Sequence, residues 1–518
     1  MKRFNPSVVA VAVICSGISM APFVSLTSED FGWQAFTQAY RTVAIPAVAR
    51  VEGSGAFFTS RVELFNSSGG DKEVVVTYTP RADLGGASRT AVVPLPGDTL
   101  LEVADPLSAW FGFSGNETAV GSLLLELRDE GEQLSADDML LAQSVVFAQN
   151  DDGSEFGQFF PALREADALG PGEVGYLASA VNAQVYRVNV GLMGLMNGTQ
   201  VIVTPQDPIG TDLAAGRTFN LDNGGNRQLN NIFNVFGLAP RDNIVVAVEV
   251  RSGVALAYAS ILDGNIVYDG TSDPTTILPA IFGAPEVTLL EVGPIQGFNE
   301  FSGSASVTNH SSGDAVVLAE FFARGQPGVA ADTTFTIPGG GTMGFDDIVG
   351  ELFAIQGVGA LRLTTQNGTL ISASGREFAL FRDGQGEVAG TAGQLIPGML
   401  PSELLAPGAT YHLLGLREVE SLSGLERSHI AAFNPGSATV TLNVEVYDGA
   451  TGRSEGDIDL TVRGGELIQR NSIIAVVNPG HNGDVKRLEV EATGPVYVRA
   501  FRVNRDGDPI TIPPQRDE

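Results

Sequence analysis

Phe156-Gly157-Gln158-Phe159-Phe160-Pro161-Ala162 is the stretch around which the chain is organised. Its ending, a large apolar residue followed by proline, recurs as Ile45-Pro46-Ala47, Leu278-Pro279-Ala280, Ile396-Pro397-Gly398 and Ile512-Pro513-Pro514. The five prolines lie 115, 118, 118 and 116 residues apart, so they divide the 518 residues into four nearly equal units. A fixed period of this kind indicates a tandem array.

The first unit sets the template for the others. Arg61 to Phe65 alternate between polar and apolar residues, which predicts a half-buried strand, and Asn66-Ser67-Ser68-Gly69-Gly70 predicts the turn that follows it. Glu73 to Tyr78 form the expected return strand, and two later strands are expected at Gly121 to Leu127 and Leu141 to Phe147. The polar and acidic insertion between them, Arg128 to Asp138, is expected to be a loop.

A short helical segment is expected in the middle of each unit. In the first unit, apolar residues at Leu100, Val103, Ala104, Leu107 and Phe111 have the spacing of one or two helical turns laid over the edge of a sheet. The corresponding segments of the later units are Leu229 to Phe233, Phe345 to Val349, and Ile468 to Val476.

Other landmarks recur in the same order. The asparagine turn returns at Met196-Asn197-Gly198, Thr308-Asn309-His310-Ser311 and Phe433-Asn434-Pro435-Gly436, although the second unit lacks the apolar residue and asparagine that end the strand. The penultimate strand returns at Val254 to Ile261, Leu370 to Phe378, and Val496 to Val503. An Asp-Gly hairpin turn follows each of these strands, at Asp263-Gly264, Asp383-Gly384 and Asp506-Gly507.

These signals predict an all-β protein made of four tandem immunoglobulin-like β-sandwich domains, each with about seven short strands and a short helical segment. Each proline is expected to end one sheet and stiffen the step to the next unit, because proline has no N–H to donate. Four units in line would form a rod on the order of 120 to 160 Å long. A chain folded back on itself is the alternative arrangement.

The predicted domain boundaries follow the prolines. We expect a signal peptide at residues 1–21, a lead-in at 22–44, and β-sandwich repeats at 45–163, 164–280, 281–398 and 399–518. The signal is expected because a basic start, Met1-Lys2-Arg3, precedes an apolar run from Ser7 to Met20 and a small-residue cleavage site. Cys15 is the one cysteine, so the processed chain would hold none and could form no disulfide.

The composition excludes several classes of partner. A net charge of −30 argues against nucleic acid, whose binders need clustered lysine and arginine, and against adhesion to an anionic bilayer. The apolar run of the signal is too short for a membrane span, and we expect no direct membrane insertion once the signal is removed. The acidity is typical of a solvated, self-repelling surface on an exported protein.

The first unit carries a resemblance to a known group of proteins. Ile45-Pro46-Ala47, Arg61 to Asn66, Leu95-Pro96-Gly97, Gly121-Ser122-Leu123 and Phe156 to Ala162 together look like tandem β-sandwich repeats of large secreted bacterial proteins, which are largely uncharacterised. The resemblance implies export and a β-sandwich fold, and it brings no catalytic residues.

No catalytic or metal-binding motif is found in the sequence. There is no Gly-x-Ser-x-Gly elbow, and none of His310, His412, His429 and His481 forms a zinc-binding pair, so each is interpreted as a turn or surface residue. The carboxylates Asp346, Asp347 and Glu351 would suit a glycosidase pair, but they lie where every unit has its short helix. We therefore predict that they cap the helix, and we predict no catalytic, cofactor-binding or metal-binding residues.

Calcium is the metal that the sequence favours over zinc, as an alternative to a protein without a cofactor. Oxygen ligands stand in tight turns near the joins between units, at Asp151-Asp152-Gly153, at Asp383-Gly384 with Glu387, and at Asn504-Arg505-Asp506-Gly507-Asp508. None of these turns has the twelve-residue spacing of an EF-hand, and a hairpin turn already explains each Asp-Gly pair. We expect no cofactor.

The sequence favours a non-catalytic, secreted or surface-exposed scaffold or adhesion protein, with a surface polymer or another protein as its partner. Specificity would then lie where a unit departs from the repeat, as at Arg128 to Asp138 or at Phe298-Asn299-Glu300-Phe301, which is expected to be a loop with two aromatic residues. The alternative is an extracellular carbohydrate-binding protein that stacks sugar rings on exposed aromatic residues such as Trp33, whereas Trp110 is expected to lie in the core. An extracellular hydrolase is a third possibility.

Overall fold

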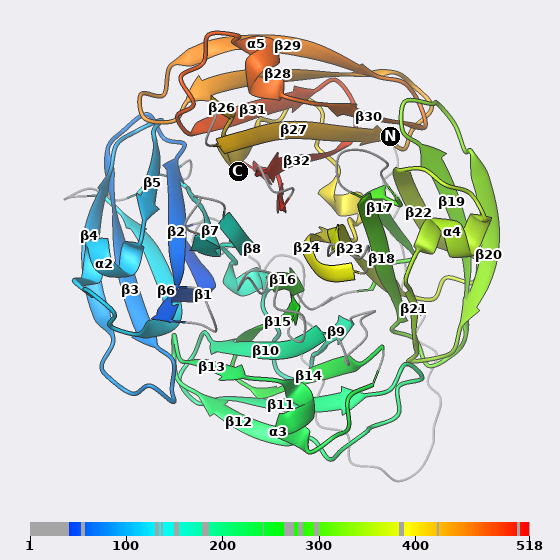
Figure 1. The fold of residues 1–518 in the computed structure, drawn as a ribbon, viewed down its shortest axis with the longest axis horizontal. Coiled ribbons are helices and arrows are strands. Elements are labelled where there is room, and N and C mark those ends of the chain that lie inside the picture. Colours follow the sequence, from blue (N-terminus) through cyan, green and yellow to red (C-terminus); the bar gives the residue numbers. More distant parts are fainter. Residues whose placement is uncertain are drawn as a thin grey trace, which may run out of the picture.

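The computed structural model folds the chain into a closed ring of four β-sandwiches, which we number repeats 1 to 4 in chain order (Figure 1). It describes residues 41–52, 57–129, 134–135, 138–149, 155–178, 186–241, 243–263, 274–277, 283–294, 300–382, 388–421, 424–504 and 508–516. The predicted signal peptide, most of the lead-in and all but the outermost residues of the three Asp-Gly turns lie outside these ranges. The ring replaces the rod that four units in line would form.

The strands and helices follow one another in the same order in all four repeats. Repeat 1 contains β1 (Thr42–Glu52), β2 (Phe57–Asn66), β3 (Lys72–Pro80), β4 (Arg89–Leu95), β5 (Leu100–Ala104), α2 (Pro106–Phe111), β6 (Ala119–Arg128), β7 (Leu140–Gln149) and β8 (Glu155–Pro161). Repeat 2 contains the 3-10 turn η1 (Glu165–Asp167), β9 (Val174–Ala178), β10 (Tyr186–Gly194), β11 (Thr199–Gln206), β12 (Arg217–Leu221), β13 (Asn226–Leu229), α3 (Ile232–Phe236), β14 (Val245–Ser252), β15 (Ala255–Asp263) and β16 (Pro274–Ile277).

Repeats 3 and 4 have the same succession. Repeat 3 contains β17 (Glu286–Val292), β18 (Glu300–Asn309), β19 (Ala315–Ala323), β20 (Ala331–Ile337), β21 (Thr342–Phe345), α4 (Ile348–Phe353), β22 (Gly359–Thr365), β23 (Ile371–Arg382) and β24 (Val388–Pro397). Repeat 4 contains the 3-10 turn η2 (Pro401–Glu403), β25 (Tyr411–Leu416), β26 (Val419–Ser421), β27 (Gly424–Asn434), β28 (Val440–Asp448), β29 (Ser454–Val462), β30 (Glu466–Arg470), α5 (Ile473–Val477), β31 (Lys486–Ala492), β32 (Tyr497–Val503), β33 (Pro509–Ile512) and β34 (Gln515–Arg516).

Each repeat is a sandwich of two antiparallel sheets. The outer sheet of repeat 2 has the order β12-β11-β14-β9, and the inner sheet, nearer the ring centre, has the order β13-β10-β15-β16 (Figure 1). Repeats 3 and 4 follow the same scheme, while in repeat 1 the long strand β1 pairs with both β6 and β2 and so joins the two sheets. The all-β sandwich prediction is confirmed, with eight recurring strands per repeat in the described chain instead of about seven.

The additional strand is β5 and its equivalents β13, β21 and β30. The sequence predicted a helical segment from Leu100 onward, but Leu100 to Ala104 pair with β2, and the helix α2 begins only at Pro106. The reason is that the inner sheet offers β5 a free edge to pair with, and the resulting ladder satisfies backbone groups that an isolated helical turn would leave unpaired.

Four separate hydrophobic cores fill the sandwiches, one in each repeat. Trp110 packs at the side of the core of repeat 1, where it is partly buried. The short helices cover these cores, and the described part of the chain contains no helix long and apolar enough to cross a membrane.

The recurring prolines do not all have the same role. Pro161 and Pro397 end β8 and β24, as the sequence predicted for a sheet end. Pro46 instead lies inside β1, where the pairing register with β6 shifts between Ile45 and Val48. Proline is accepted there because a bulge removes the need for its missing N–H.

The ring closes because one contact recurs at all four junctions between repeats. At each junction a backbone hydrogen bond joins the turn after the third strand of one repeat to the fifth strand of the next. The four bonds are Ala82 N to Asn226 O (3.0 Å), Thr342 N to Pro208 O (2.6 Å), Gly325 N to Leu467 O (2.8 Å) and Leu100 N to Gly449 O (2.8 Å). The last of them joins repeat 4 back to repeat 1, and we call this the closing junction.

Tight backbone approach accompanies these bonds at the closing junction. Gly452 has φ of 65°, and a Cβ at this residue would stand 2.6 Å from the carbonyl oxygen of Asp98 in repeat 1. Glycine is required here both for the left-handed conformation and for the lack of a side chain. The close fit indicates that repeats 4 and 1 are shaped for each other.

The inner strands are buried on both faces, which differs from the half-buried strand predicted at Arg61 to Phe65. Val62 and Leu64 point into the core of repeat 1, while Glu63 and Phe65 on the opposite face are also buried. The preceding repeat in the ring covers this second face, so the alternation of polar and apolar residues does not correspond to water on one side.

A buried asparagine locks the end of the second strand in three of the repeats. Asn434 donates from Nδ2 to Ala438 O (2.6 Å) and Val462 O (3.0 Å), and its Oδ1 accepts from Gly436 N (3.0 Å). Asn66 and Asn309 make the equivalent bonds, whereas β10 of repeat 2 ends at Gly194. The asparagine turns predicted from the sequence are therefore backbone clamps between two strands.

We expect Asn434→Ala to lower the free energy of unfolding by about 1 to 3 kcal/mol, because it leaves buried backbone groups without partners. Asn197→Ala is the matched control, since Asn197 is exposed and makes a single bond, to Asn223 N, so its effect should stay within about 0.5 kcal/mol. Denaturant unfolding measures both, and equal losses in the two variants would contradict the clamp.

The closed ring predicts a compact particle in solution. Small-angle X-ray scattering should give a radius of gyration of about 24 Å for a compact chain of this length, whereas a rod on the order of 120 Å would give about 35 Å or more. Gly452→Val should increase the radius by opening the closing junction. Gly368→Val should not, because Gly368 has a similar φ of 71° but meets no atom within 4 Å of its Cβ position. An unchanged radius for Gly452→Val would show that other contacts hold the ring.

Candidate functional site

A cavity of about 420 Å³ lies at the junction between repeats 2 and 3, on the side of the ring centre. Its volume is within the range of about 300 to 1,000 Å³ that is usual for small-ligand sites. The described residues that line it come from β8, η1, β9, β17, β18, β23, β24, η2 and β33, so all four repeats contribute to its wall.

The cavity exists because two residue pairs of repeat 3 consist of serine and threonine alone, whereas each equivalent pair in the other repeats contains at least one large side chain. The positions concerned form two cross-strand pairs on the face of the inner sheet that contacts the preceding repeat. In repeat 1 the pairs are Phe65 with Leu141 and Glu63 with Gln143; in repeat 2, Met193 with Leu256 and Gly191 with Tyr258; in repeat 4, Phe433 with Tyr497 and Ala431 with Arg499. In repeat 3 they are Thr308 with Ser372 and Ser306 with Ser374.

The other three junctions are filled at this place. Apolar clusters join Phe65 and Leu141 to Leu414 of repeat 4, Met193 and Leu256 to Ala44 of repeat 1, and Phe433 and Tyr497 to residues of repeat 3. In the described chain no such cluster occurs between repeats 2 and 3 at the equivalent positions. The junction between repeats 2 and 3 therefore contains a hydroxyl-lined cavity where the other junctions have apolar packing.

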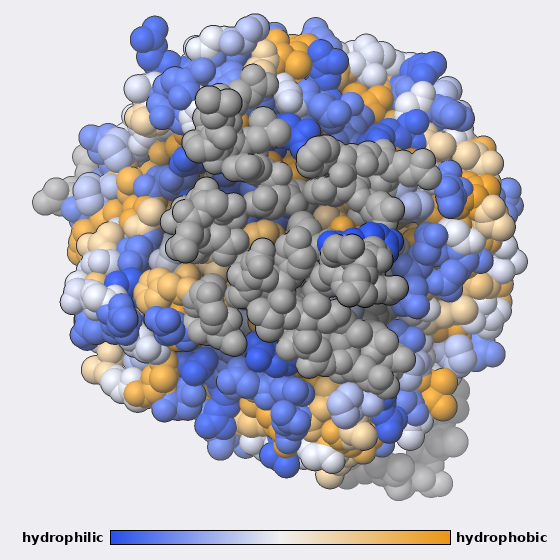
Figure 2. All heavy atoms as spheres, viewed as in Figure 1, coloured by the Kyte–Doolittle hydropathy of each residue, from blue (hydrophilic) through white to orange (hydrophobic). Residues whose placement is uncertain are grey.

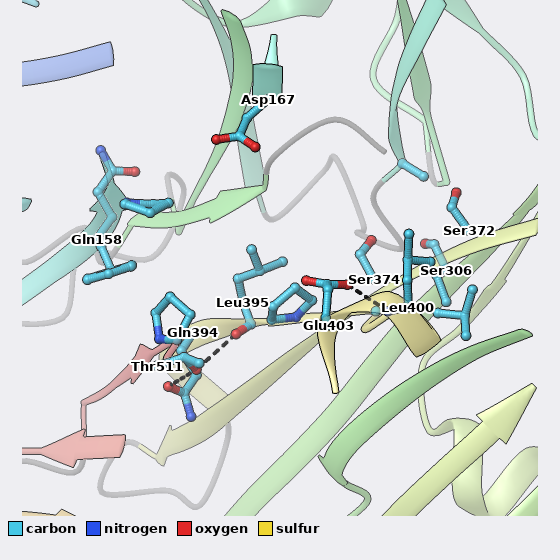
Figure 3. A pocket seen from close by; sticks show the side chains of 18 of the residues that line it. Gln158, Asp167, Ser306, Ser372, Ser374, Gln394, Leu395, Leu400, Glu403 and Thr511 are labelled. Atoms are coloured by element: carbon cyan, nitrogen blue, oxygen red, sulfur yellow. Dashed lines mark hydrogen bonds between the residues drawn. The ribbon is translucent and has the colours of Figure 1, made fainter. Parts of the chain in front are cut away.

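The serine hydroxyls form one wall of the cavity. Ser306, Ser372 and Ser374 lie together on one side, opposite Gln158, with Asp167 above and Glu403 between them (Figure 3). The hydroxyl of Ser306, a residue that is only 3% exposed, makes no hydrogen bond within the part of the chain that the structure describes. The hydroxyl of Ser306 faces the cavity, so a ligand or water there can supply its hydrogen bond.

Two glutamines form the opposite wall and are held in place. Gln158 accepts at Oε1 from the hydroxyl of Ser260 (2.8 Å). Gln394 accepts from Thr511 Oγ1 (2.5 Å), as a dashed line in Figure 3 shows. It also donates from Nε2 to Glu377 Oε2 (2.9 Å). The amides are thus pre-positioned by neighbouring strands.

Two carboxylates reach the cavity from equivalent turns. Asp167 ends η1 and Glu403 ends η2, each accepting a hydrogen bond from the backbone N–H three residues before it, at Arg164 (2.9 Å) and Leu400 (2.6 Å). Arg164 also forms an ion pair with Asp167 (2.7 Å). Burial raises the pKa of the Glu403 carboxyl, the bond from Leu400 and the charge of Arg499 oppose this shift, and the charge of Asp167 adds to it.

Behind Gln394 lie two buried glutamates. Desolvation by burial raises the pKa of Glu377 to about 7, although the hydrogen bond from Gln394 lowers it. Burial likewise raises the pKa of Glu291 to about 8, although the ion pair with Arg324 (3.1 Å) lowers it. Both side chains thus bind a proton at neutral pH more readily than an exposed glutamate does.

One pair of residues at the cavity has the form of a nucleophile and its base. Ser372 Oγ and His310 Nε2 are 2.8 Å apart, and the ring of Tyr176 contacts His310 edge-on with centroids 5.4 Å apart. Burial lowers the pKa of His310, so the imidazole is neutral at pH 7 and can accept a proton. This pair could not be found in the sequence, because its members lie 62 residues apart and are brought together by the pairing of β18 with β23.

The carboxylates that the sequence singled out are structural. Asp347 caps α4 by accepting from Gly350 N (3.0 Å), and Glu351 accepts from the backbone N–H groups of Asp346 and Asp347. The capping prediction is confirmed. In repeat 4 the cap comes from a distance, as Glu418 accepts from Ile474 N and Ala475 N at the start of α5.

Two of the histidines differ from the prediction that they are turn or surface residues. His412 lies buried on β25 and stacks against Phe65 across the closing junction, with ring centroids 4.9 Å apart. His429 lies buried on β27, where its Nδ1 accepts from Ser472 N (3.2 Å) and burial lowers its pKa to about 4. Both became buried because the adjacent strands and repeats cover them.

Several other sequence-based sites fall partly or wholly outside the described residues. Trp33, Phe298 and the centres of the turns considered for calcium are among them. Glu300 and Phe301 begin β18, so they belong to a strand and not to the expected loop. Within the described ranges no three His, Cys, Asp or Glu side chains are grouped so that they could hold a metal ion.

Comparison with known proteins shows little similarity. No family model matches the chain, and no curated protein matches it. One solved structure, described as the crystal structure of a tetra-tandem repeat in the extending region of a large adhesion protein, is 13% identical and covers 91% of this chain and 99% of its own. The TM-score is 0.11, so the two chains do not superpose as wholes.

The raised pKa of Glu377 predicts a pH-dependent stability. A carboxyl that holds its proton more tightly when folded stabilises the protein at low pH, and this contribution is lost as pH rises through about 7. We expect Glu377→Gln, which imitates the protonated form, to differ little from the wild type at pH 5 and to gain about 1 to 3 kcal/mol relative to it by pH 8. Denaturant unfolding at each pH measures this gain, and a difference that stays constant would contradict the shift.

Proposed function

We propose that this chain is an exported, non-catalytic scaffold in which four β-sandwich repeats act as one rigid ring and offer its rim to a surface polymer or another protein. The observation that supports the proposal is the recurrence of the same backbone contact at all four junctions, including the closing junction. A head-to-tail interface that closes on itself uses up its own contact surface, so the ring does not extend into a fibre.

The surface of the ring is suited to such a role. On the face shown in Figure 2, hydrophilic and hydrophobic residues of the described chain are interspersed around the rim and do not collect into one large apolar patch. Exposed large apolar residues are scattered among the repeats, at Leu84, Val92, Met196, Ile209, Val329, Met343 and Leu370. The net charge of −30 keeps such a particle soluble and separate from others of its kind.

The carboxylates on which a hydrolase might depend are engaged in structure, which also favours a non-catalytic role. Asp105 and Asp347 cap helices, and Glu102 and Glu155 pair with arginines around the closing junction. The predicted signal peptide is the reason for proposing export, and a chain without cysteine after Cys15 would then rely on packing and hydrogen bonds for its stability.

Surface binding by the intact ring tests the proposal. Fluorescently labelled protein should be retained by intact bacterial cells or by their insoluble surface polymers. Gly452→Val should reduce this retention several-fold because it loosens the closing junction, and Gly368→Val should not. Equal retention of both variants would show that the ring form does not matter for binding.

A catalytic role is tested in the same preparations. We expect no turnover of ester or polysaccharide substrates and no labelling by a serine-directed fluorophosphonate. Turnover or labelling that disappears in Ser372→Ala would contradict the non-catalytic proposal and would identify Ser372 and His310 as a hydrolytic pair.

A further inference from the structure

We propose that the cavity between repeats 2 and 3 is a binding site for a small neutral saccharide. This site does not depend on the scaffold role of the ring. It is the place where the chain departs most from its own repeat, since four hydroxyl residues occupy two cross-strand pairs that contain at least one large side chain each in the other three repeats. Apolar packing at an interface stabilises the fold. The loss of this packing between repeats 2 and 3 therefore lowers the stability of the folded chain.

The hydroxyl of Ser306 has no hydrogen-bond partner among the described residues, so it is available to a ligand in the cavity. Ser306 is nine-tenths buried and points into the cavity, and it makes no hydrogen bond among the described residues (Figure 3). On the same strand, the hydroxyl of Thr308 lies 2.9 Å from that of Thr342. Thr308 therefore has a partner within the protein, whereas Ser306 has none among the described residues. A ligand hydroxyl would supply what Ser306 lacks.

The charge around the cavity favours a neutral ligand. Its described lining contains no lysine, arginine or histidine, so nothing in it would bind an anion. Of its two acidic groups, Asp167 is already paired with Arg164, and Glu403 accepts a backbone hydrogen bond and has the buried Arg499 near it. A cation would therefore find no free pair of carboxylates here.

The mixture of surfaces favours a polyhydroxylated ring over a lipid or an apolar ligand. The serine wall offers hydroxyl donors and acceptors, and a purely apolar ligand would leave the hydroxyl of Ser306 without a partner. The lining also contains the ring of Tyr176 and the apolar groups of Leu395 and Ile510, which match the C–H faces of a sugar. A saccharide has both kinds of surface.

The test uses the whole protein and a panel of free mono- and disaccharides, with oligosaccharides of the same sugars as a second arm. We expect at least one free sugar to raise the melting temperature and to bind in calorimetry. Tighter binding of the free sugar would identify a soluble ligand, and tighter binding of the oligosaccharide would identify the end of a glycan chain. A panel in which no sugar binds would overturn the proposal.

Three variants locate the binding. Ser374→Gln introduces the residue that repeat 1 has at this position and should fill the cavity, weakening binding at least about tenfold. Ser306→Ala should weaken it about fivefold through the loss of one hydrogen bond. Ser304→Ala, on the same strand but outside the described lining, should leave affinity within about twofold.

The folded state of each variant is checked by scattering, because a radius of gyration equal to that of the wild type separates a filled cavity from a broken ring. Binding that survives Ser374→Gln in a folded ring would place the sugar elsewhere and would overturn the proposal. A crystal structure with the sugar bound between Ser306 and Gln158 would confirm it.

Discussion

A backbone hydrogen bond between the turn after the third strand of one repeat and the fifth strand of the next is the contact that all four junctions of the ring share. It recurs four times, and its fourth occurrence, between Leu100 N and Gly449 O, joins residues that are 349 positions apart. Three of the junctions connect successive repeats and one connects the last repeat to the first. Because the geometry of the step is the same each time, four steps complete a circle and the chain closes on itself.

Around this shared contact the junctions have diverged. The junction between repeats 3 and 4 is held by an apolar cluster that includes Phe322, Phe433 and Tyr497. The closing junction also uses buried polar groups: Gln143 donates to Leu414 O (3.1 Å), and Arg502 forms an ion pair with Glu63 (3.9 Å). Groups buried in this way are costly when they are misaligned, so they distinguish the correct pair of repeats from the other pairings that four similar sandwiches could form.

The junction between repeats 2 and 3 has diverged furthest. The hydroxyls of Thr308 and Ser372 have hydrogen-bond partners within the protein. The small side chains at this junction, however, leave a volume unfilled that larger side chains fill at the other interfaces. All four interfaces share the backbone contact that closes the ring, and the interface between repeats 2 and 3 differs in having a cavity beside that contact. In a repetitive protein, function is to be sought where the pattern breaks.

Much of the fold could be read from the sequence, because it depends on local signals. Alternating residues and asparagine turns predicted the strands at Glu73 to Tyr78 and Leu141 to Phe147, and the helix-capping role of Asp347 followed from its position in the repeat. The prediction of a helical segment from Leu100 was wrong for Leu100 to Ala104, because these residues pair with β2 at the edge of the inner sheet.

The fourfold array of β-sandwiches follows from the amino-acid sequence alone, since hydrophobic period and turn chemistry act over a few residues. The ring does not follow from it, because closure depends on the angle between neighbouring repeats, which no local pattern encodes. The tertiary structure also decided the site: Ser306 and Ser374 look like ordinary strand serines until strand pairing places them opposite Gln158 from another repeat. Residues far apart in the chain share a cavity because the ring brings their repeats together.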